Sequence, residues 1–240
     1  MKVPRLDVLV ARSGLVESRE RAQALILAGK VRVAGETVRR PDRSVSDAAS
    51  ISVEAGPDYA SRGALKLAPA LERFGVDPSG RICADIGAST GGFTDVLLRR
   101  GAARVYAIDV GRGLIHWRLR QDPRVVVIER VNARELGSFP EPVSLIVVDV
   151  SFIGLEKVLP ALLRAAPRAE IVALFKPQFQ VGRYEVGKGG IVRDPVVIET
   201  ALARFRVWCA TNGFVVRAVA PSELMGAEGN REIFLDLVPA

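Results

Sequence analysis

The sequence predicts two domains of different fold class: a small α+β domain at the N-terminus, then a larger α/β domain with a doubly wound, mostly parallel sheet. The chain has 240 residues, 49% of them hydrophobic, which suits one mid-sized domain and one small one. From residue 81 onward, apolar runs alternate with amphipathic stretches. The boundary between the two domains is marked by Gly56-Pro57-Asp58, because Gly and Pro together are typical of a linker. We therefore expect domains at 1–55 and 61–240, joined by a linker at 56–60.

The first domain is expected to hold two short helices and a small sheet. Leu6, Leu9 and Val10 recur at helical spacing. Ser18 is a suitable N-cap for a second helix, and Gly29 is a natural stop for it. Strands are expected at 30–33, where apolar and basic residues alternate, and at 51–53, with a turn at Gly35.

This first segment is also basic, with ten Lys and Arg against seven Asp and Glu in residues 1–54. Neighbouring basic side chains can form a patch that contacts phosphates, although a solvated surface has the same composition. Through Arg5-Leu6-Asp7, Ser18-Arg19 and Gly29-Lys30-Val31-Arg32-Val33, the segment resembles the RNA-binding domain named after small-subunit ribosomal protein S-four. It departs from that family at Ala34, where Asn is usual. The resemblance implies docking on structured RNA.

The second domain is expected to contain seven strands, at 82–86, 104–109, 124–128, 143–149, 170–175, 214–219 and 233–238. Helices are expected between them, at 93–100, 155–165 and 195–212. Ligands of doubly wound sheets bind at the carboxyl ends of the strands. The residues that follow each strand are therefore the first candidates for a functional site.

The loop after the first of these strands predicts a cofactor site. It consists of Gly87-Ala88-Ser89-Thr90-Gly91-Gly92, and such small residues let the backbone approach a ligand closely. The loop lacks the second glycine of the dinucleotide pattern. Asp85 would repel a pyrophosphate but could hold the amino-acid end of a sulfonium cofactor. Asp109 ends the next strand and could accept hydrogen bonds from ribose hydroxyls. We therefore favour S-adenosylmethionine over NAD.

Two further strand ends carry ionisable side chains. Lys176 follows the apolar strand at 170–175, and Asp149 ends the strand at 143–149. Each could be a surface charge, but two such groups at the functional edge are more typical of catalysis. A lysine whose pKa is lowered by burial or by a neighbouring cation can remove the proton of a hydroxyl nucleophile.

The second domain resembles the FtsJ-type RNA 2′-O-methyltransferases, and residues 4–238 resemble the TlyA family, once called haemolysin A, which joins an S-four-like domain to that fold. The matching segments are Ser61 to Leu67, Asp85 to Thr94, Asp149 to Ile153, Lys176 to Phe179 and Gly229 to Glu232. The resemblance implies a Rossmann-like S-adenosylmethionine-dependent methyltransferase acting on a cytidine ribose 2′-hydroxyl of ribosomal RNA.

The resemblance also implies the site residues. The catalytic set would be Lys66, Asp149, Lys176 and Glu232. Lys176 would be the general base or the group that orients the hydroxyl, Asp149 would position it, and Lys66 and Glu232 would hold the ribose. Cofactor contacts would come from Asp85, Gly87, Ala88, Ser89, Gly91, Gly92, Phe93, Asp109, Val110, Asn132, Ala133 and Asp149. Asn132 stands where FtsJ proper often has an acid, and its amide oxygen can still accept a hydrogen bond from adenine.

RNA contacts are expected from basic residues of both domains: Arg5, Arg12, Arg19, Arg21, Lys30, Arg32, Arg62 and Lys188. A glycine-rich stretch, from Gly182 to Gly190, has the composition of either a mobile lid or an ordinary flexible loop, with Arg183, Lys188 and Arg193 as its basic residues. Shorter members of the family are associated with the large-subunit site. Because this sequence starts almost at the RNA-binding domain and ends just after the last strand, we expect 23S rRNA alone as the substrate.

Other features bound the alternatives. The net charge of +7 favours a polyanionic partner without identifying it. Cys83 and Cys209 lie in apolar stretches and are expected to be buried, and His116 is expected to be structural. No signal peptide or membrane-spanning run is visible, so we expect a cytoplasmic enzyme that needs no metal or membrane. The alternatives are an RNA-binding protein with a degenerate methyltransferase fold and a haemolysin.

Overall fold

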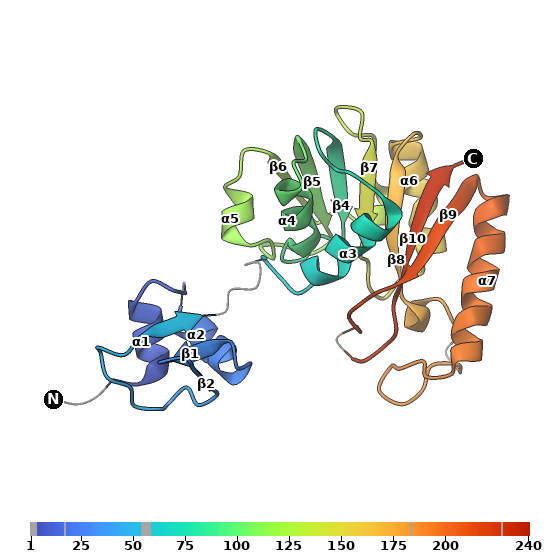
Figure 1. Ribbon diagram of the computed structural model, residues 1–240. Coiled ribbons are helices and arrows are strands. Elements are labelled where there is room, and N and C mark those ends of the chain that lie inside the picture. Colours follow the sequence, from blue (N-terminus) through green and yellow to red (C-terminus); the bar gives the residue numbers. More distant parts are fainter. Residues whose placement is uncertain (1–3, 17, 54–58, 183, 227) are drawn as a thin grey trace. The chain divides into compact units, whose positions relative to one another are not determined.

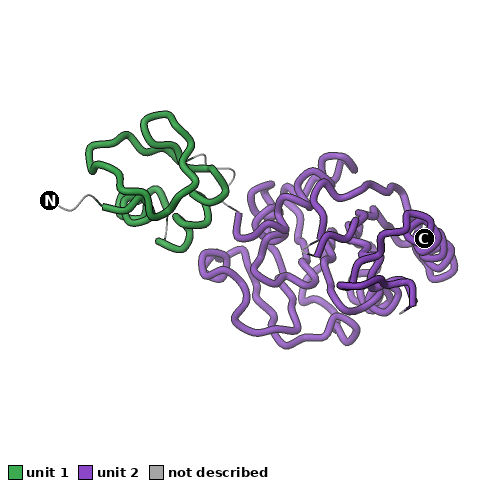
Figure 2. Tube along the Cα trace, turned by 90° about the horizontal axis from the view of Figure 1, so that it is seen from below, with its two compact units in different colours: residues 1–58 green, residues 59–240 purple. Residues whose placement is uncertain are grey.

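The computed structural model describes residues 4–16, 18–53, 59–182, 184–226 and 228–240. The chain divides into two units, residues 1–58 and 59–240 (Figure 2). Residues 56–58 of the expected linker lie outside the described residues. Each unit has its own hydrophobic core and is described by itself.

The first unit holds two helices, α1 (Leu6–Arg12) and α2 (Arg19–Leu27), packed on a small antiparallel sheet. Its strands are β1 (Val31–Val33), β2 (Glu36–Val38) and β3 (Ile51–Val53), in the order β2-β1-β3. The Ser18 hydroxyl accepts a hydrogen bond from Arg21 N at 3.1 Å, so the expected N-cap is confirmed. Strand β2 was not expected, because its short sequence shows little alternation.

The second unit is built on one seven-stranded sheet, as the fan of arrows in Figure 1 shows. Its strands are β4 (Ile82–Ile86), β5 (Arg104–Asp109), β6 (Val125–Glu129), β7 (Leu145–Val148), β8 (Glu170–Phe175), β9 (Phe214–Pro221) and β10 (Ile233–Pro239). The order is β6-β5-β4-β7-β8-β10-β9. The strands from β4 to β8 are parallel, and β10 runs antiparallel to both β8 and β9. The expected mostly parallel α/β fold is confirmed.

Alternate residues of the central strands enter two different cores, so the sheet is buried on both faces. Along β7, Ile146 and Val148 belong to one core, whereas Leu145 and Val147 belong to the other. This explains the continuous apolar runs of the sequence, because a two-sided sheet has no polar face. The first core is covered by α6 (Leu159–Ala165) and α7 (Pro195–Thr211), and the second by α3 (Ala64–Phe74) and α4 (Gly92–Arg99) (Figure 1).

Two helical segments differ from the expectation. Helix α3 was not expected, because Pro69 interrupts its pattern, yet the helix continues to a left-handed Gly75 C-cap with φ +67°. The expected helix at 155–165 is divided into a 3₁₀ turn, η2 (Leu155–Lys157), and helix α6, with Pro160 in the first turn of α6. Helix α3 brings Lys66, one of the expected site residues, to the carboxyl edge of the sheet, beside Gly87 and Asp149.

Candidate active site

The β4–α4 loop makes a tight approach to the next strand end. Gly87 has a φ of +83°, and a Cβ on it would lie 2.5 Å from the backbone oxygen of Asp149. Gly91 also has a positive φ, of +93°, and Ser89 adopts the left-handed region at +48°. Only glycine fits at Gly87 without strain or collision. The loop therefore lies directly beside the end of β7.

Asp85 is fully buried where β4 ends, and it fixes the start of helix α4. Its Oδ2 accepts hydrogen bonds from Thr94 N at 2.9 Å and from Thr94 Oγ1 at 2.7 Å. Its Oδ1 is buried without a hydrogen-bond partner among the described residues. Burial, reinforced by the nearby carboxylates of Asp149 and Asp109, outweighs the Thr94 bonds and raises the pKa of Asp85 to about 7.

Asp109 holds two loops together at the end of β5. Its Oδ2 accepts from Ser89 N at 2.7 Å, and its Oδ1 accepts from Gly111 N at 2.7 Å. Each carboxylate oxygen can accept a second hydrogen bond, so ribose hydroxyls can still bind there. Asn132 is also engaged, because its Oδ1 accepts from Arg134 N at 3.1 Å and caps a 3₁₀ turn, η1 (Ala133–Glu135).

Two cavities meet at this loop. The first, of about 230 Å³, is lined by Ser61, Arg62, Gly63, Lys66, Gly87, Ala88, Ser89, Thr90, Gly92, Phe93, Asp149, Leu224 and Met225. The second, of about 410 Å³, is lined mainly by apolar residues, among them Val110, Ala133 and Phe152, and also by Asp109 and Asn132. Gly87, Ser89 and Asp149 line both. The two cavities therefore form adjacent lobes of one cleft, one polar and one mostly apolar.

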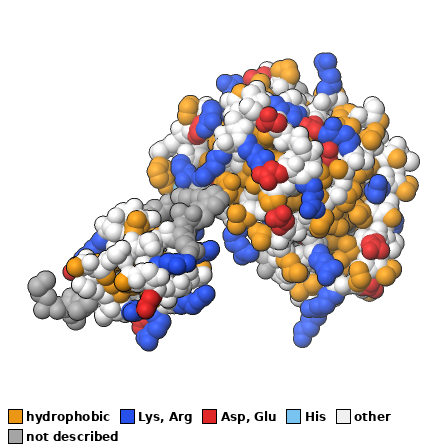
Figure 3. All heavy atoms as spheres, in the orientation of Figure 1, with side chains coloured by type: hydrophobic (Ala, Val, Ile, Leu, Met, Phe, Trp, Pro, Cys, Tyr) orange, Lys and Arg blue, Asp and Glu red, His pale blue; other side chains and the backbone are white. Residues whose placement is uncertain are grey.

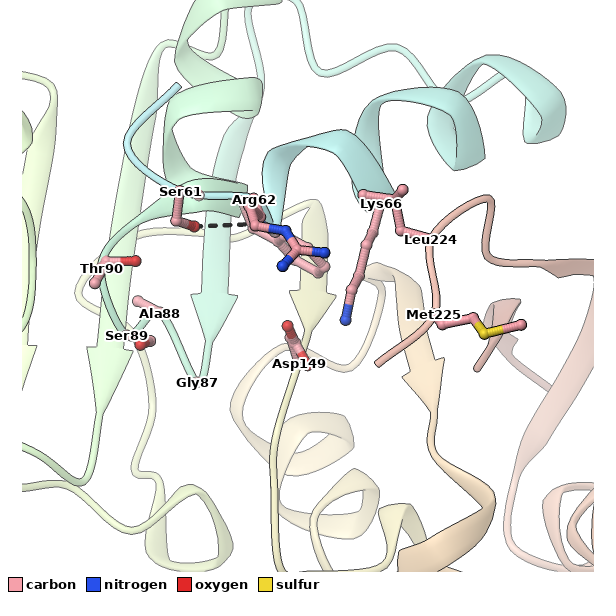
Figure 4. A pocket seen from close by; sticks show the side chains of 13 residues that line it. Ser61, Arg62, Lys66, Gly87, Ala88, Ser89, Thr90, Asp149, Leu224 and Met225 are labelled. Atoms are coloured by element: carbon pink, nitrogen blue, oxygen red, sulfur yellow. Dashed lines mark hydrogen bonds between the residues drawn. The ribbon is translucent and has the colours of Figure 1, made fainter. Parts of the chain in front are cut away.

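The expected catalytic side chains form two ion pairs at this edge. Lys176 Nζ lies 2.5 Å from Asp149 Oδ1 and donates a hydrogen bond to Ser151 Oγ at 3.0 Å. Lys66 Nζ donates to Glu232 Oε2 at 2.6 Å. In Figure 4, the Lys66 and Asp149 side chains point toward the same opening. Ser151 is a partner of Lys176 that the sequence reasoning did not identify.

Sheet topology explains why Glu232 reaches this edge. Strand β10 is antiparallel to β8, and Ile233 is paired with Phe175. The residue before Ile233 therefore lies beside the residue after Phe175. Glu232 precedes the start of β10, and Lys176 follows the end of β8. Of the four side chains, Lys66 and Asp149 line the polar lobe. Lys176 and Glu232 do not line it, but Lys176 contacts Asp149 and Glu232 contacts Lys66. Glu232 instead lines a separate cavity of about 430 Å³ with Met225 and Arg231.

A buried acid on α4 anchors the segment that leads to this site. Asp95 accepts a hydrogen bond from Ala60 N at 2.8 Å and is paired with Arg99 and Arg118. Arg99 also lies over the Tyr59 ring, 4.6 Å from its centroid. Residues 59–63, which end three residues before Lys66, are thereby fixed beside the Gly87 to Gly92 loop. Asp95 was not among the expected site residues.

An exposed aromatic side chain lies where the apolar lobe meets a third cavity. Phe152 is 90% exposed, has a φ of +63° and contacts Phe179, with ring centroids 5.3 Å apart. The third cavity, of about 760 Å³, is lined by both rings and by Arg134 and Lys157. A left-handed conformation at a bulky residue is strained, and such strain is concentrated at functional sites.

In the first unit, two of the expected RNA-contacting arginines are engaged with one buried acid. Arg5 and Arg19 both pair with Asp7, at 3.1 Å, and Gln23 donates to the same carboxylate at 2.7 Å. Burial raises the pKa of Asp7, but the hydrogen bonds from Arg5, Gln23 and Arg19 outweigh it and hold this pKa well below its usual range. Arg19 and Gln23 therefore tie α2 to α1, whereas Arg5 pairs with Asp7 at the start of α1. About half of the Arg5 and Arg19 side chains stays exposed.

The remaining expected RNA contacts lie at the surface. Arg12, Arg21, Lys30 and Arg32 are exposed, and Figure 3 shows Lys and Arg side chains along the visible face of the first unit. In the second unit, Arg62 is exposed at the polar lobe, where its guanidinium points toward Lys66 in Figure 4. Lys188 is exposed on the glycine-rich loop. Arg183 lies outside the described residues.

The cysteines and the histidine have structural surroundings. Cys83 and Cys209 are fully buried, as expected, and burial raises the pKa of each thiol to about 12. His116 caps the short helix α5 (Trp117–Arg120), because its Nδ1 accepts from Arg118 N at 3.3 Å. Within the described residues, no cluster of His, Cys, Asp and Glu is arranged to hold a metal ion.

We expect Gly87→Ala to disrupt the cleft. Its Cβ would collide with the Asp149 backbone, and its φ would be strained, so the free energy of unfolding should fall by about 1–3 kcal/mol. Calorimetry should also show weaker binding of S-adenosylmethionine. Gly75→Ala is the matched control, because Gly75 has a φ of +67° but nothing within 4 Å of its Cβ position. Equal ligand affinity in the two variants would contradict this role of the Gly87 loop.

Comparisons with known proteins agree with this geometry. Residues 59–237 match the FtsJ-like methyltransferase family, and residues 4–49 match the S4 domain. The chain is 49% identical over 238 residues to a protein of Mycobacterium tuberculosis named 16S/23S rRNA (cytidine-2′-O)-methyltransferase TlyA, covering 96% of this chain and 88% of that protein. It is 43% identical to Hemolysin A of Brachyspira hyodysenteriae, covering 95% of this chain and 97% of that protein.

A solved structure of a Streptococcus thermophilus protein, named as a hemolysin, is also similar. Its identity is 40%, its TM-score is 0.77, and the match covers 100% of this chain and 90% of that one. Among the residues that the structure describes, we find no helix with the length and hydropathy needed to cross a bilayer.

Proposed function

Because the chain belongs to the FtsJ-like methyltransferase family and carries an S4 domain before that fold, we propose that it methylates the 2′-hydroxyl of a cytidine in ribosomal RNA. The methyl donor is S-adenosylmethionine. One observation carries the proposal: side chains from α3, from the ends of β7 and β8, and from the start of β10 form two ion pairs beside the cofactor cleft. The relative with 49% identity bears the name of this reaction.

The cleft suits S-adenosylmethionine in both shape and chemistry. The apolar lobe with Asp109 and Asn132 fits a ribose and an adenine ring. Small residues of the Gly87 to Gly92 loop line the polar lobe, so a methionine chain can lie against the loop backbone. We assign the cofactor contacts to residues that line the cleft: Gly87, Ala88, Ser89, Gly92, Phe93, Asp109, Val110, Asn132, Ala133 and Asp149. Gly91 lines neither lobe, and we assign it to the turn of the loop, where its φ is +93°. Asp85 lines neither lobe, so we assign it to fixing the loop and helix α4 behind the cofactor.

The side chains of the two ion pairs then act on the acceptor ribose. When bound, S-adenosylmethionine supplies a methyl group on a sulfonium, and the sulfur keeps the electron pair of the broken bond. Lys176 Nζ accepts the 2′-hydroxyl proton, or orients that hydroxyl, as the oxygen attacks. Asp149 and Ser151 fix the position of Nζ. Lys66, held by Glu232, contacts the ribose from the polar lobe.

RNA binding is the proposed task of the first unit together with the basic residues around the cleft. Arg12, Arg21, Lys30 and Arg32 supply phosphate contacts, and Arg62 and Lys188 extend them to the catalytic unit. Arg5 and Arg19 contribute through their exposed guanidinium edges while both pair with Asp7, and the Arg19 pair holds α2 against α1. The expectation of 23S rRNA alone stays a prediction, because the name of the 49% identical relative includes both 16S and 23S rRNA.

Methyl transfer from labelled S-adenosylmethionine to each purified ribosomal subunit tests the function. We expect incorporation at a cytidine 2′-oxygen, with label in the large subunit. Incorporation into a base, or into neither subunit, would contradict the proposal. Calorimetry with S-adenosylmethionine separates the alternative of a degenerate fold, because a purely RNA-binding protein would not bind the cofactor.

A further inference from the structure

Asn230 is a buried amide that no step of the proposed reaction uses. Its side chain is 1% exposed, although it lies in the connection between β9 and β10. Its Oδ1 accepts a hydrogen bond from Val192 N at 2.9 Å, and its Nδ2 donates to Gly190 O at 2.9 Å. One side chain thus joins two distant segments of the chain through both of its polar atoms.

The segment that Asn230 holds is the glycine-rich loop, 187–192. This loop is bent sharply, with φ values of +77° at Gly189 and +76° at Gly190. Within the loop, Gly187 N donates to Ile191 O, and Gly190 N donates to Gly187 O, each at 3.1 Å. The two hydrogen bonds with Asn230, together with the buried Val192 side chain, hold the end of this loop in place. The loop presents Lys188, a proposed RNA contact, to solvent.

The backbone around Asn230 leads directly to the catalytic groups. Its own carbonyl accepts from Gly226 N at 2.9 Å, which anchors the segment whose Leu224 and Met225 line the polar lobe. Two residues later, Glu232 pairs with Lys66, and the Glu232 carbonyl accepts from Ser222 N at 2.9 Å. Glu232 is packed so closely that a Cβ on Gly226 would lie 2.7 Å from its Oε1.

We propose that Asn230 is a positioning residue that couples the glycine-rich loop to Glu232, so that RNA contact at the loop and the placement of the Lys66–Glu232 pair depend on each other. The expected effect on kcat rests on the proposed function. The chemistry requires an amide, because the side chain must accept from one backbone N–H and donate to one backbone carbonyl. A carboxylate keeps the first bond but sets an oxygen against the Gly190 carbonyl.

The experiment compares Asn230→Ala and Asn230→Asp with the intact chain. A small displacement of catalytic groups lowers rates by up to roughly 10²-fold, so we expect kcat for RNA methylation to fall by about 10–100-fold in both variants. The affinity for S-adenosylmethionine should stay within about twofold, because Asn230 lines neither lobe of the cleft. Asn212→Ala, at an exposed asparagine after α7, is the matched control and should keep wild-type kinetics.

The Asp variant adds a readout that a merely structural role would not move. A protonated Asp can again donate to Gly190 O, so the ratio of variant to wild-type kcat should rise as the pH falls from 8 to 6. A ratio that is flat with pH would overturn the proposal. An unchanged kcat would also overturn the proposal. A joint fall of kcat, cofactor affinity and the midpoint of thermal unfolding would overturn it as well.

Hydrogen exchange at the Val192 amide keeps this test separate from the proposed function. Exchange should be faster in Asn230→Ala and protected in Asn230→Asp, whose remaining oxygen still accepts from Val192 N. If the wild-type protein methylates no RNA, the proposed function fails. The link between Asn230 and the loop is then supported or overturned by the exchange result alone.

Discussion

Lys176→Ala should lower kcat for methyl transfer by roughly 10²–10⁴-fold, the usual contribution of a general acid or base. Lys176 is 8% exposed at the end of β8, where its Nζ contacts Asp149 and Ser151. It lines neither cofactor lobe, so the dissociation constant for S-adenosylmethionine should change by no more than a few-fold. Single-turnover kinetics with the ribosomal subunit that accepts the methyl group measure the rate of transfer. Calorimetry measures the dissociation constant for S-adenosylmethionine.

A second variant separates the two roles that remain open for Lys176. Arginine keeps a positive charge near Asp149, but its guanidinium stays protonated in proteins. If Lys176 accepts the proton, Lys176→Arg should be as inactive as Lys176→Ala. If Lys176 only orients the hydroxyl, the Arg variant should keep a measurable part of the activity. Methyl transfer by Lys176→Ala at the wild-type rate would refute both roles.

The positions of Asp85, Asp109, Asp149 and Lys176 were predictable because of the period and length of the strands. Each lies at or next to the end of an apolar run, and in a parallel sheet all such ends meet at one edge. The structure brings these four residues together at the carboxyl ends of β4, β5, β7 and β8. This reasoning needs only local sequence, since each strand is buried on both faces and therefore continuously apolar.

Lys66 and Glu232 could not be placed in this way. Lys66 lies on α3, whose pattern is interrupted by Pro69. Glu232 stands before a strand, so the carboxyl-end rule would put it at the wrong edge. It reaches the site only because β10 is antiparallel to β8. Strand direction depends on long-range pairing that no local pattern records, so the resemblance alone indicated these two residues.

Charge composition likewise could not distinguish a phosphate contact from a structural ion pair. Arg5 and Arg19 belong to the basic set that the sequence suggests for RNA, yet both hydrogen-bond to Asp7. Arg19 and Gln23 are twelve and sixteen residues from Asp7 along the chain. Only the packing of α2 against α1 brings them together. The same limit applies to Asn230, whose partners lie 38 and 40 residues away.

Asp85→Asn should stabilise the protein most at pH 8, less at pH 5, and have little effect below pH ~4. In the folded state, burial raises the pKa of Asp85 to about 7 from the ordinary value of 3.8. Below pH ~4, the carboxyl is protonated in both states, and the folded state carries no penalty. As the pH rises toward 7, the unfolded chain ionises freely while the buried group resists ionisation. Stability is therefore lost over this range and stays lower above it.

The size of the effect follows from the difference between the two pKa values. One pKa unit corresponds to 1.36 kcal/mol, so a difference of about three units is on the order of 4 kcal/mol. Asparagine does not ionise, and its oxygen can still accept both hydrogen bonds from Thr94. The midpoint of thermal unfolding of the variant should exceed that of the wild type by several degrees at pH 8.

Comparing the difference between variant and wild type at each pH isolates Asp85 together with its electrostatic coupling to Asp149 and Asp109, because groups that do not interact with Asp85 titrate equally in the two proteins. The Oδ1 of Asp85 is buried without a hydrogen-bond partner among the described residues, so the two Thr94 bonds at Oδ2 offset only part of the cost of burying the charge. A difference in thermal midpoint that is the same at pH 5 and pH 8 would show that Asp85 ionises normally in the folded protein. A difference that grows with pH would mean that the cofactor loop is held by an acid whose charge the fold disfavours near neutral pH. A cation bound close to Asp85 would then lower its pKa and couple ligand binding to proton release.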